Sequence, residues 1–509
     1  QCGSSIVDRL TINNFDRGAP QLVTPICDSG ITNFSVTNLY VLNQARVSFE
    51  PADVAELQHA FAEIGVLHGD ASGTLDVIGQ STVILSNNGL KHSPVTYELS
   101  AERVGPHENV VTTKTKYYMN DFLNSAIHIQ VREAGVLVTP PRLAISNNTD
   151  VVVYGHLSGA NSLILGASSS LTLKSTGHTD GKPRNQYHFE DLIVEDGGTL
   201  TTEEISSNDG GVAGIACVIT GKNFTLGSET AGTTTSTLTI DGGLNITVDN
   251  FKITSTGVLN GVGKGFKVAS GPGAGLSTGY GGSYGGRGGR NTKTPGEAGG
   301  PYGNYKYPAL QGSGGNTYKA AGGAGGGALI LRLAKSLTVD GSIDFSGSTG
   351  MSFNQHGHAT YGGSGGSGGT VFIDTPAFSG TGSIKANGGN GQQGCSWQGN
   401  PPTCHSGGGG GGRIAVWCTS TTYTGSIQAK GGAGGASYTG SPGTIYEQCG
   451  SSIVDRLTIN NFDRGAPQLG SMIESSGHAA INLGSLSLQN KAVLAFPDDS
   501  SPVFFSIGG

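Results

Sequence analysis

Three similar stretches of sequence decide the fold of this chain. They are ALILRLAKSLTVDGSIDFSG at Ala328–Gly347, TVFIDTPAFSGTGSIKANG at Thr370–Gly388 and RIAVWCTSTTYTGSIQAKG at Arg413–Gly431. Each contains an alternating strand, a short break, the triplet Gly-Ser-Ile and a second short strand that ends at glycine. The triplets begin at Gly341, Gly382 and Gly425, so the pattern recurs after 41 and then 43 residues. A fainter copy spans Leu244–Gly261 and has Gly-Val-Leu in place of the triplet.

This pattern predicts an all-β fold in which successive coils stack. Short strands between glycine or polar turns cannot bury one face alone, whereas stacked coils align equivalent apolar residues in inward ladders. We expect Asp374, Lys385 and Gln428 to alternate outward. The inward residues should be Val371, Ile373, Ile384, Ile414, Val416 and Ile427. The sequence therefore predicts a β-solenoid of the parallel β-helix type with long glycine-rich loops, since the units of a β-sandwich array would be nearer to about 100 residues.

Composition excludes several other classes of protein. Glycine makes up 88 of 509 residues, far above the average of roughly 7%, but it does not recur at every third position as in collagen. Apolar runs such as Ala328–Leu331 are much too short to span a membrane. Charged residues make up only 13% of the chain, and short Val, Ile, Thr and Leu runs are frequent, which argues against disorder.

A second, longer repeat organises the whole chain. Gln1–Leu22 recurs identically as Gln448–Leu469, an offset of 447 residues, and weaker similarity continues without a gap. The sequence therefore predicts an irregular β-solenoid over 1–240, glycine-rich repeats over 241–447 and the start of a second copy over 448–509. We expect residues near Leu457–Asn461 to occupy the environment of Leu10–Asn14.

One short helix is predicted near 51–65, within the first of these regions. Its apolar residues are spaced for one helical face, and they are Val54, Leu57, Phe61 and Ile64.

The glycine-rich half resembles a known class of repeats. GGAGGGALILRLAKSLTVDGSIDFSG, GGSGGTVFIDTPAFSGTGSIKANGGNG, GGGGGGRIAVWC and GSPGTIYE are similar to the glycine-rich β-helix repeats of very large secreted or cell-surface proteins. The resemblance covers Leu244–Glu447 closely and the first 240 residues only in general character. It implies a right-handed, pectin-lyase-like parallel β-helix in an extracellular setting, and it implies no particular chemistry.

Cysteines and glycosylation sequons also favour an extracellular protein. The seven cysteines form no CxxC or other metal-binding spacing. Cys395 and Cys404 bracket a Pro-Pro turn, and we predict a disulfide between them; the partners of the other cysteines stay open. Asn-x-Ser/Thr sequons predict glycosylation at Asn33, Asn147, Asn223 and Asn245.

Candidate catalytic and metal-binding residues are few. Glu190, Asp191, Glu195 and Asp196, with His188 beside them, could supply the paired carboxylates of a hydrolase. Asp191 and Glu195 share strand parity, as do Glu190 and Asp196, but acids at strand ends usually face solvent. His356 and His358 have no third ligand nearby, and the glycine runs lack the Gly-Lys-Ser/Thr ending of a phosphate-binding loop. We expect no catalytic residue, no metal and no cofactor.

One basic glycine-rich segment has a different composition. Gly281–Arg290 reads GGSYGGRGGR and lies among several tyrosines, a composition that can stack on single-stranded nucleic acid. In a secreted chain it is more simply a surface loop, or a segment laid on the solenoid or on a neighbouring subunit by tyrosines and close glycine backbones. Trp397 and Trp417 are interpreted as packing residues in preference to sugar platforms.

These patterns favour a structural protein over an enzyme. An uncapped solenoid exposes unpaired backbone groups at its ends and so templates further stacking. We expect a filament, hair or stalk at the cell surface or outside the cell, continuous either along one polypeptide or through subunit contacts. The partners would be other copies of the chain, with glycans or other surface proteins as further candidates, and neither nucleic acid nor a membrane span is expected. The alternatives are a polysaccharide lyase or hydrolase on a β-helix, and an adhesin.

Overall fold

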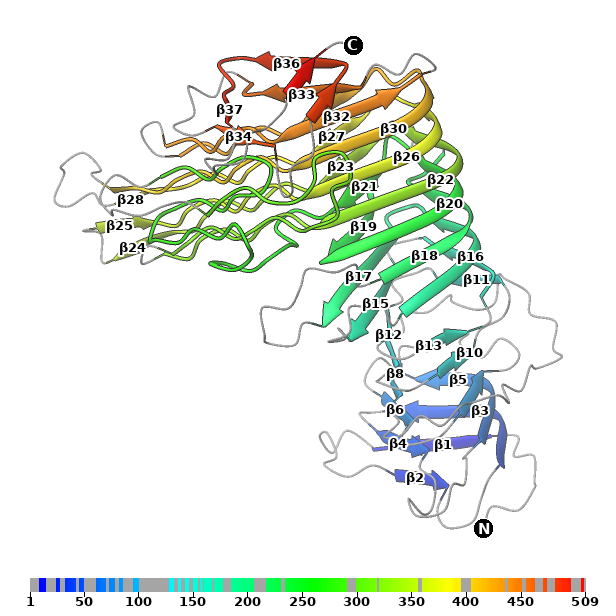
Figure 1. Cartoon of the computed structure of the whole chain (residues 1–509). Helices are drawn as coiled ribbons and strands as arrows, with labels where there is room; N and C mark the ends of the chain where they lie inside the picture. Colours follow the sequence, from blue (N-terminus) through cyan, green and yellow to red (C-terminus); the bar gives the residue numbers. More distant parts are fainter. Residues whose placement is uncertain are drawn as a thin grey trace. The chain divides into compact units, whose positions relative to one another are not determined.

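The computed structural model is all-β over the residues that it describes (Figure 1). No helix occurs among these residues, and so none has the length and apolarity needed to cross a membrane. The described residues are 9–14, 24–27, 33–42, 45–49, 61–69, 73–77, 82–85, 95–99, 128–131, 136–138, 142–145, 150–153, 156–158, 160–166, 169–176, 185–205, 217–229, 234–290, 299–317, 320–355, 359–394, 404–434, 438–450, 455–462, 470–473, 481–495 and 505–507.

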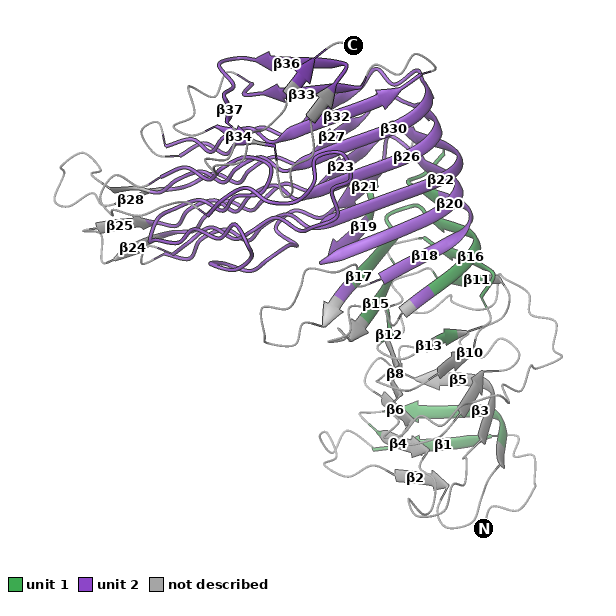
Figure 2. Ribbon diagram, viewed as in Figure 1, with its two compact units in different colours: residues 1–175, 187–202, 225–237 green, residues 176–186, 203–224, 238–509 purple. Residues whose placement is uncertain are grey.

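The chain forms two compact units (Figure 2). The first comprises residues 1–175, 187–202 and 225–237, and the second comprises 176–186, 203–224 and 238–509. Five strands carry residues of both units: β15 (Ser170–Thr176), β16 (Asn185–Val194), β17 (Thr199–Ile205), β18 (Cys217–Leu226) and β19 (Ser236–Asp241).

The first unit consists of short parallel strands that add one beside another. One sheet has the order β1 (Leu10–Asn13), β3 (Asn33–Leu42), β5 (Phe61–Gly69) and β7 (Thr82–Leu85). A second sheet has the order β2 (Thr24–Cys27), β4 (Arg46–Phe49), β6 (Gly73–Val77), β8 (Val95–Leu99), β9 (His128–Val131), β12 (Asp150–Val153) and β15 (Ser170–Thr176). The remaining strands are β10 (Val136–Val138), which pairs with β13 (His156–Ser158), and the row β11 (Arg142–Ile145), β14 (Ser162–Leu165) and β16 (Asn185–Val194).

The predicted helix near 51–65 is wrong over its last five residues. Residues 61–65 belong to β5, where Phe61 pairs with Asn33 and Ile64 pairs with Val36. Apolar Ala62, Ile64 and Val66 also alternate with Glu63 and Gly65, which is the period of a strand, and the backbone pairs with the ten-residue strand β3. The rest of the helix prediction, over 51–60, lies outside the described residues.

From β20 (Gly243–Ile253) to β31 (Ser426–Gln428) the second unit alternates between two sheets of parallel strands, and β32 (Thr444–Cys449), β33 (Arg456–Asn460) and β36 (Ser485–Gln489) extend the first of them. The first has the order β20, β22 (Ala328–Val339), β26 (Thr370–Ser379), β30 (Arg413–Thr421), β32, β33 and β36. The second has the order β21 (Gly257–Asn260), β23 (Ser342–Asp344), β27 (Ser383–Lys385) and β31. Short pairs are β24 (Ser352–Gln355) with β25 (Ala359–Gly362), β28 (Gln393–Gly394) with β29 (Cys404–His405), β34 (Ser471–Met472) with β37 (Leu494–Ala495), and β35 (Ile481–Leu483) with β38 (Phe505–Ile507).

The predicted stacking of the repeats is confirmed in register. Ile343, Ile384 and Ile427 of the three triplets pair in one ladder, and Leu259 of the fainter copy extends it. Five of the six residues predicted to face inward are buried, and Asp374 is exposed. The sixth, Ile427, is only half-buried, because β31 is the last strand of its sheet and no further described strand covers it.

The glycine-rich stretches between strands form a hydrogen-bonded layer where the sequence predicts loops. We call the described residues of 261–327, 346–369, 386–412 and 429–443 the glycine layer; they run side by side from the ends of β22, β26 and β30 (Figure 1). The N–H of Gly389 donates to Gly366 at 2.8 Å, that of Gly409 to Gly389 at 2.9 Å and that of Gly432 to Gly409 at 2.8 Å. A Cβ at Gly409 would overlap the carbonyl oxygen of Gly366, so close backbone approach requires glycine here.

Candidate junction between repeats

The start of the second copy reproduces the strand pairing of the first copy. Leu457 pairs with Leu486 in β33 and β36, and Leu10 pairs with Leu39 in β1 and β3, 447 residues earlier. The β34–β37 pair likewise repeats the pairing of β2 with β4. The backbone hydrogen bond that follows the strand recurs too, from Asn14 to Leu42 and from Asn461 to Gln489, at 3.3 Å in both copies.

The second copy attaches to the repeats through one antiparallel strand pair. β30 and β32 are parallel, but β33 runs antiparallel to β32, with Ile445 opposite Thr458, Tyr446 opposite Leu457 and Glu447 opposite Arg456. A guanidinium nitrogen of Arg456 lies 2.6 Å from Glu447 Oε2. The chain therefore changes strand direction where the second copy begins. We call β32, β33 and the side chains of Lys306 and Asp455 the junction.

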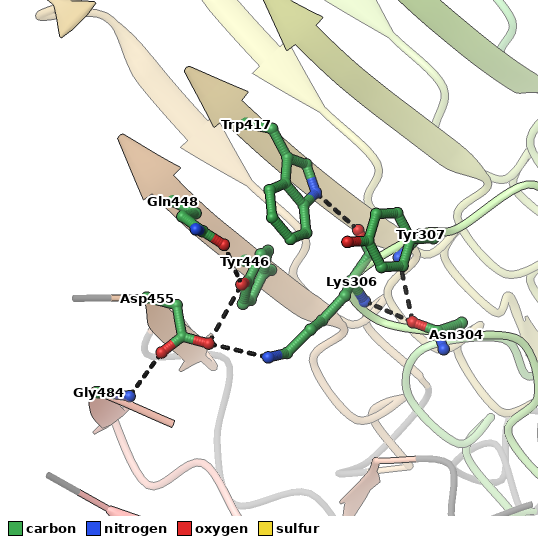
Figure 3. A network of polar contacts seen from close by, with 8 residues as sticks. All are labelled: Asn304, Lys306, Tyr307, Trp417, Tyr446, Gln448, Asp455 and Gly484. Carbon is green, nitrogen blue, oxygen red and sulfur yellow. Dashed lines mark hydrogen bonds and ion pairs between the residues drawn. The ribbon is translucent and has the colours of Figure 1, made fainter. Parts of the chain in front are cut away.

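A polar network joins the two sides of the junction (Figure 3). Lys306 Nζ, from the glycine layer, lies 2.9 Å from Asp455 Oδ2, and the backbone N–H of Gly484 donates to Asp455 Oδ1 at 2.6 Å. The Tyr446 hydroxyl lies 3.1 Å from Asp455 Oδ2 and 2.9 Å from Gln448 Oε1. One carboxylate of the second copy thus binds three groups, two of which belong to the first 447 residues.

The network shifts the proton affinities of its members. Burial alone would raise the pKa of Asp455, but the hydrogen bond and positive charge of Lys306, with the bonds from Gly484 and Tyr446, hold it below its ordinary value. Burial, together with the negative charge of Asp455, raises the pKa of Tyr446. The network therefore favours an ionised aspartate beside a neutral phenol.

Aromatic side chains of the glycine layer pack on the strands beside the network. Tyr307 stacks on Trp417 with ring centroids 4.8 Å apart, and the Trp417 indole N–H donates to the Lys306 carbonyl at 2.9 Å. Tyr305 meets Tyr446 edge to face at 5.8 Å. Trp417 thus has the packing contacts that the sequence predicted. The apolar core of the junction comprises Tyr305, Ile330, Phe372, Ala415, Tyr446, Leu457, Ile459, Ile473 and Leu483.

A buried arginine holds the glycine layer onto the same strands. Arg413 begins β30 and is completely buried. Its Nε donates to the Tyr302 carbonyl at 2.9 Å, and one terminal nitrogen donates to the Thr444 hydroxyl at 3.2 Å. The guanidinium also lies over the ring of Tyr284. These contacts fix the strand that carries Tyr446 relative to the segment that carries Lys306.

A disulfide that the sequence did not predict links β30 to β32. It joins Cys418 to Cys449, which lie opposite each other in the paired strands. Cys449 is the second-copy equivalent of Cys2, so the start of the second copy is covalently tied to the last glycine-rich repeat. Among the described residues, Cys217 is a free thiol whose burial raises its pKa to about 12, which keeps it protonated.

The residues predicted for modification are only partly within the described chain. Cys395 lies outside it, and Cys404 is in β29 opposite Gly394, so the predicted bridge between them stays a prediction. Asn223 is exposed in β18 and accepts a hydrogen bond from Asn250 at 3.0 Å. Asn245 is half-buried in β20. Asn33 begins β3, and Asn147 lies outside the described residues.

The candidate catalytic acids do not share the strand faces that the sequence predicted. Glu190 and Asp191 are consecutive on β16 and both lie between the buried Phe189 and Leu192. Glu195 and Asp196 follow β16, and Asp196 lies in a turn. The strand alternation therefore does not place Glu195 on the face of Asp191, or Asp196 on the face of Glu190. Burial and the neighbouring Asp196 charge raise the pKa of Glu195. His188 is exposed on the same strand.

The other candidate sites fall into the glycine layer or outside the described residues. No cluster of three potential metal ligands occurs among the described residues, while His356 and His358 lie outside them. Gly281–Arg290 is part of the glycine layer: Gly282 donates to Gly365 at 3.0 Å, and Tyr284 is completely buried. This matches the interpretation in which tyrosines and close glycine backbones lay the segment on the strands.

The junction should weaken in acid. The lowered pKa of Asp455 means that its contribution to stability is complete above the ordinary carboxyl value of 3.8 and is lost as the pH falls through the lowered value. We expect Asp455→Asn to reduce the free energy of unfolding of the junction by about 1–3 kcal/mol at neutral pH and to remove this acid dependence. Urea titrations followed by Trp417 fluorescence, in a Trp397→Phe background, measure both quantities. An unchanged acid dependence in the variant would contradict the role of Asp455.

Comparisons with known proteins do not assign the chain to a family. No protein-family model matches it. No curated protein matches it, and no solved structure does. Any functional assignment therefore rests on the geometry of the chain.

Proposed function

We propose that this chain is the structural repeat of an extracellular or cell-surface filament, hair or stalk, built from 447-residue units joined end to end. The observation that carries the proposal is the recurrence of the β1–β3 register in β33–β36, on strands that are already docked against the preceding repeats. A second copy that refolds in the same register directly after the first is what a linear array of units requires.

The fold proposed for each unit is a right-handed parallel β-helix, as the resemblance of the glycine-rich half implies. Alternation of successive strands between two parallel sheets supports this architecture. In the second unit, the close-packed glycine layer adds hydrogen bonds along the direction in which coils stack. Side chains add to these bonds, since the N–H of Lys430 donates to Asn387 and that of Ala433 to Asn390, both at 2.9 Å. A layer bonded in this way would stiffen the stack, which suits a mechanical role.

An extracellular setting is supported by the disulfide at the junction. Disulfides persist in oxidising compartments and are rare in the cytosol, and Cys418–Cys449 ties a strand of the last repeat to the start of the second copy. Glycans on the predicted sequons would fit the same setting, and Asn223 is exposed for such a modification. We propose self-association or covalent concatenation of units as the main interaction, and no catalytic activity.

Electron microscopy of the native material tests this function. We expect filaments whose axial repeat corresponds to one 447-residue unit, with the glycine layer as a lateral ridge once per unit. Discrete particles that cleave a polysaccharide, with loss of activity on replacing Glu190 or Asp191, would contradict the structural role and favour the enzyme.

A further inference from the structure

The same strand is buried to different extents in the two copies. In the second copy Leu457 and Ile459 are completely buried, because β33 is paired with β32 and covered by the junction core. Their first-copy equivalents in β1, Leu10 and Ile12, are only partly buried. β1 pairs with β3 and ends the row of described strands in its sheet. The face that the junction covers in one copy is therefore partly open in the other.

The residues that make the junction are repeated in the first copy. Asp8, Arg9, Leu10, Thr11 and Ile12 are identical to Asp455–Ile459, and Ile26 is identical to Ile473. Ser471, whose hydroxyl donates to the Pro442 carbonyl at 2.5 Å, has Thr24 as its counterpart, which offers the same donor. The first-copy counterpart of Leu483, a residue of the junction core, is Val36, which is also apolar.

The exposed arginine of the first copy is held in a position from which it can reach an acid. The Arg9 guanidinium lies over the Tyr40 ring, 4.3 Å from its centroid. Its second-copy equivalent, Arg456, pairs instead with Glu447 across the junction. The Arg9 Nε also donates to the Thr11 hydroxyl at 3.4 Å, at the long end of the hydrogen-bond range, so both of its contacts are weak ones that a carboxylate can replace.

We propose that β1 is a docking surface for the β32 edge of another copy of the unit, in the antiparallel register seen at the junction. Leu10 would lie opposite Tyr446, Thr11 opposite Ile445 and Arg9 opposite Glu447 of the partner copy. This inference rests on the proposed end-to-end assembly and names a surface through which two units can join when the β32 edge of one of them is free. In the intact chain β33 occupies its own β32 edge, and its high effective concentration keeps that edge closed to other chains.

Opening the junction in the full chain tests this surface. Leu457→Asp places a charge in the junction core and should release β33 while leaving Leu10 intact. We expect wild type to sediment as a monomer, and Leu457→Asp to form dimers and longer species as its concentration rises, with an apparent dissociation constant at least tenfold below that of wild type. The matched control Leu10→Asp/Leu457→Asp should return to a monomer, and Leu10→Asp alone should behave as wild type.

Two results would overturn the proposal. One is a monomeric Leu457→Asp chain with the junction shown to be open by increased amide hydrogen exchange over 456–460. The other is equal association of Leu457→Asp and Leu10→Asp/Leu457→Asp, which would show that the freed edge binds without using β1.

A second variant that releases β33 is needed in case Leu457→Asp does not fold. Asp455→Lys/Arg456→Glu faces Lys306 and Glu447 with like charges and changes no buried apolar residue. It should associate in the same way, and adding Leu10→Asp should again abolish association; association that survives Leu10→Asp would count against β1. Filaments in native material without Leu10-dependent pairing would remove this docking surface but keep the proposed function. Leu10-dependent pairing of purified chains, with no filaments in native material, would keep this docking surface but remove the proposed function.

Discussion

Replacing Gly409 with valine should strongly destabilise the second unit. Gly409 donates to Gly389 and accepts from Gly432, and its Cβ position overlaps the Gly366 carbonyl. The segment that contains Gly366 and Ser367 would have to move away from Gly409 to admit a side chain. Because overpacking a tight core typically costs 1–3 kcal/mol and sometimes more, we expect the free energy of unfolding to fall by more than about 3 kcal/mol.

Gly300→Val provides the matched control for this prediction. A Cβ at Gly300 meets no atom within 4 Å, and its backbone is outside the left-handed region. The change should therefore stay within about 0.5 kcal/mol of wild type. Urea unfolding followed by circular dichroism measures both variants. Equal stability of the Gly409 and Gly300 variants would show that the glycine layer contributes nothing to the fold.

Replacing Ile384 with aspartate is the second substitution with a large expected effect. Ile384 is completely buried between Ile343 and Ile427 in the triplet ladder. An unpaired carboxylate there has no hydrogen-bonding partner, so we expect a loss of at least about 4 kcal/mol or failure to fold. The adjacent Lys385→Asp, on the opposite face of the same strand, should change stability by less than about 0.5 kcal/mol.

Ile427→Asp tests whether a substitution at the end of the isoleucine ladder costs less stability than one in its interior. Since Ile427 is half-buried on the edge strand β31, its aspartate keeps contact with water and should cost clearly less than Ile384→Asp. Thermal unfolding of the three variants measures the order. A larger loss at Ile427 than at Ile384 would indicate that another segment covers β31 in solution.

The sequence was sufficient to predict the stacking of the glycine-rich repeats. The Gly-Ser-Ile triplets fixed the register, because a shift of one residue would turn Ile384 outward and Lys385 inward. This prediction depends on side chains whose burial alternates along a strand, which is the signal that sequence carries most directly. The identical segments predicted that residues near Leu457–Asn461 would occupy the environment of Leu10–Asn14. The strand pairing agrees, but Leu457 and Ile459 are completely buried whereas Leu10 and Ile12 are only partly buried.

Features determined by backbone geometry or by distant partners were not predicted. The sequence identity between β1 and β33 does not indicate the direction of β32 relative to β33. The antiparallel β32–β33 pair therefore could not be predicted. Runs of glycine have no side-chain pattern, so the sequence predicts loops where the structure has the glycine layer. The Lys306–Asp455 ion pair joins residues that are 149 positions apart in the sequence. The one sequence feature that singled out Asp455 was its place in the repeated segment Gln448–Leu469. The error at 61–65 arose because Ile64 fits both the helical spacing from Leu57 and Phe61 and the strand alternation of Ala62, Ile64 and Val66.

The reversed strand direction at the junction has a consequence for fidelity of assembly. The three coils at β22, β26 and β30 are so similar that the edge of a parallel strand could pair with any of them. Two chains that joined through such an edge could therefore be displaced by one coil. An antiparallel partner matched to Tyr446 and Glu447 occurs in only one place per 447 residues among the repeated segments. In the proposed assembly, each unit would therefore have one end that pairs in a single register, and a displacement by one coil would leave Asp455 without Lys306.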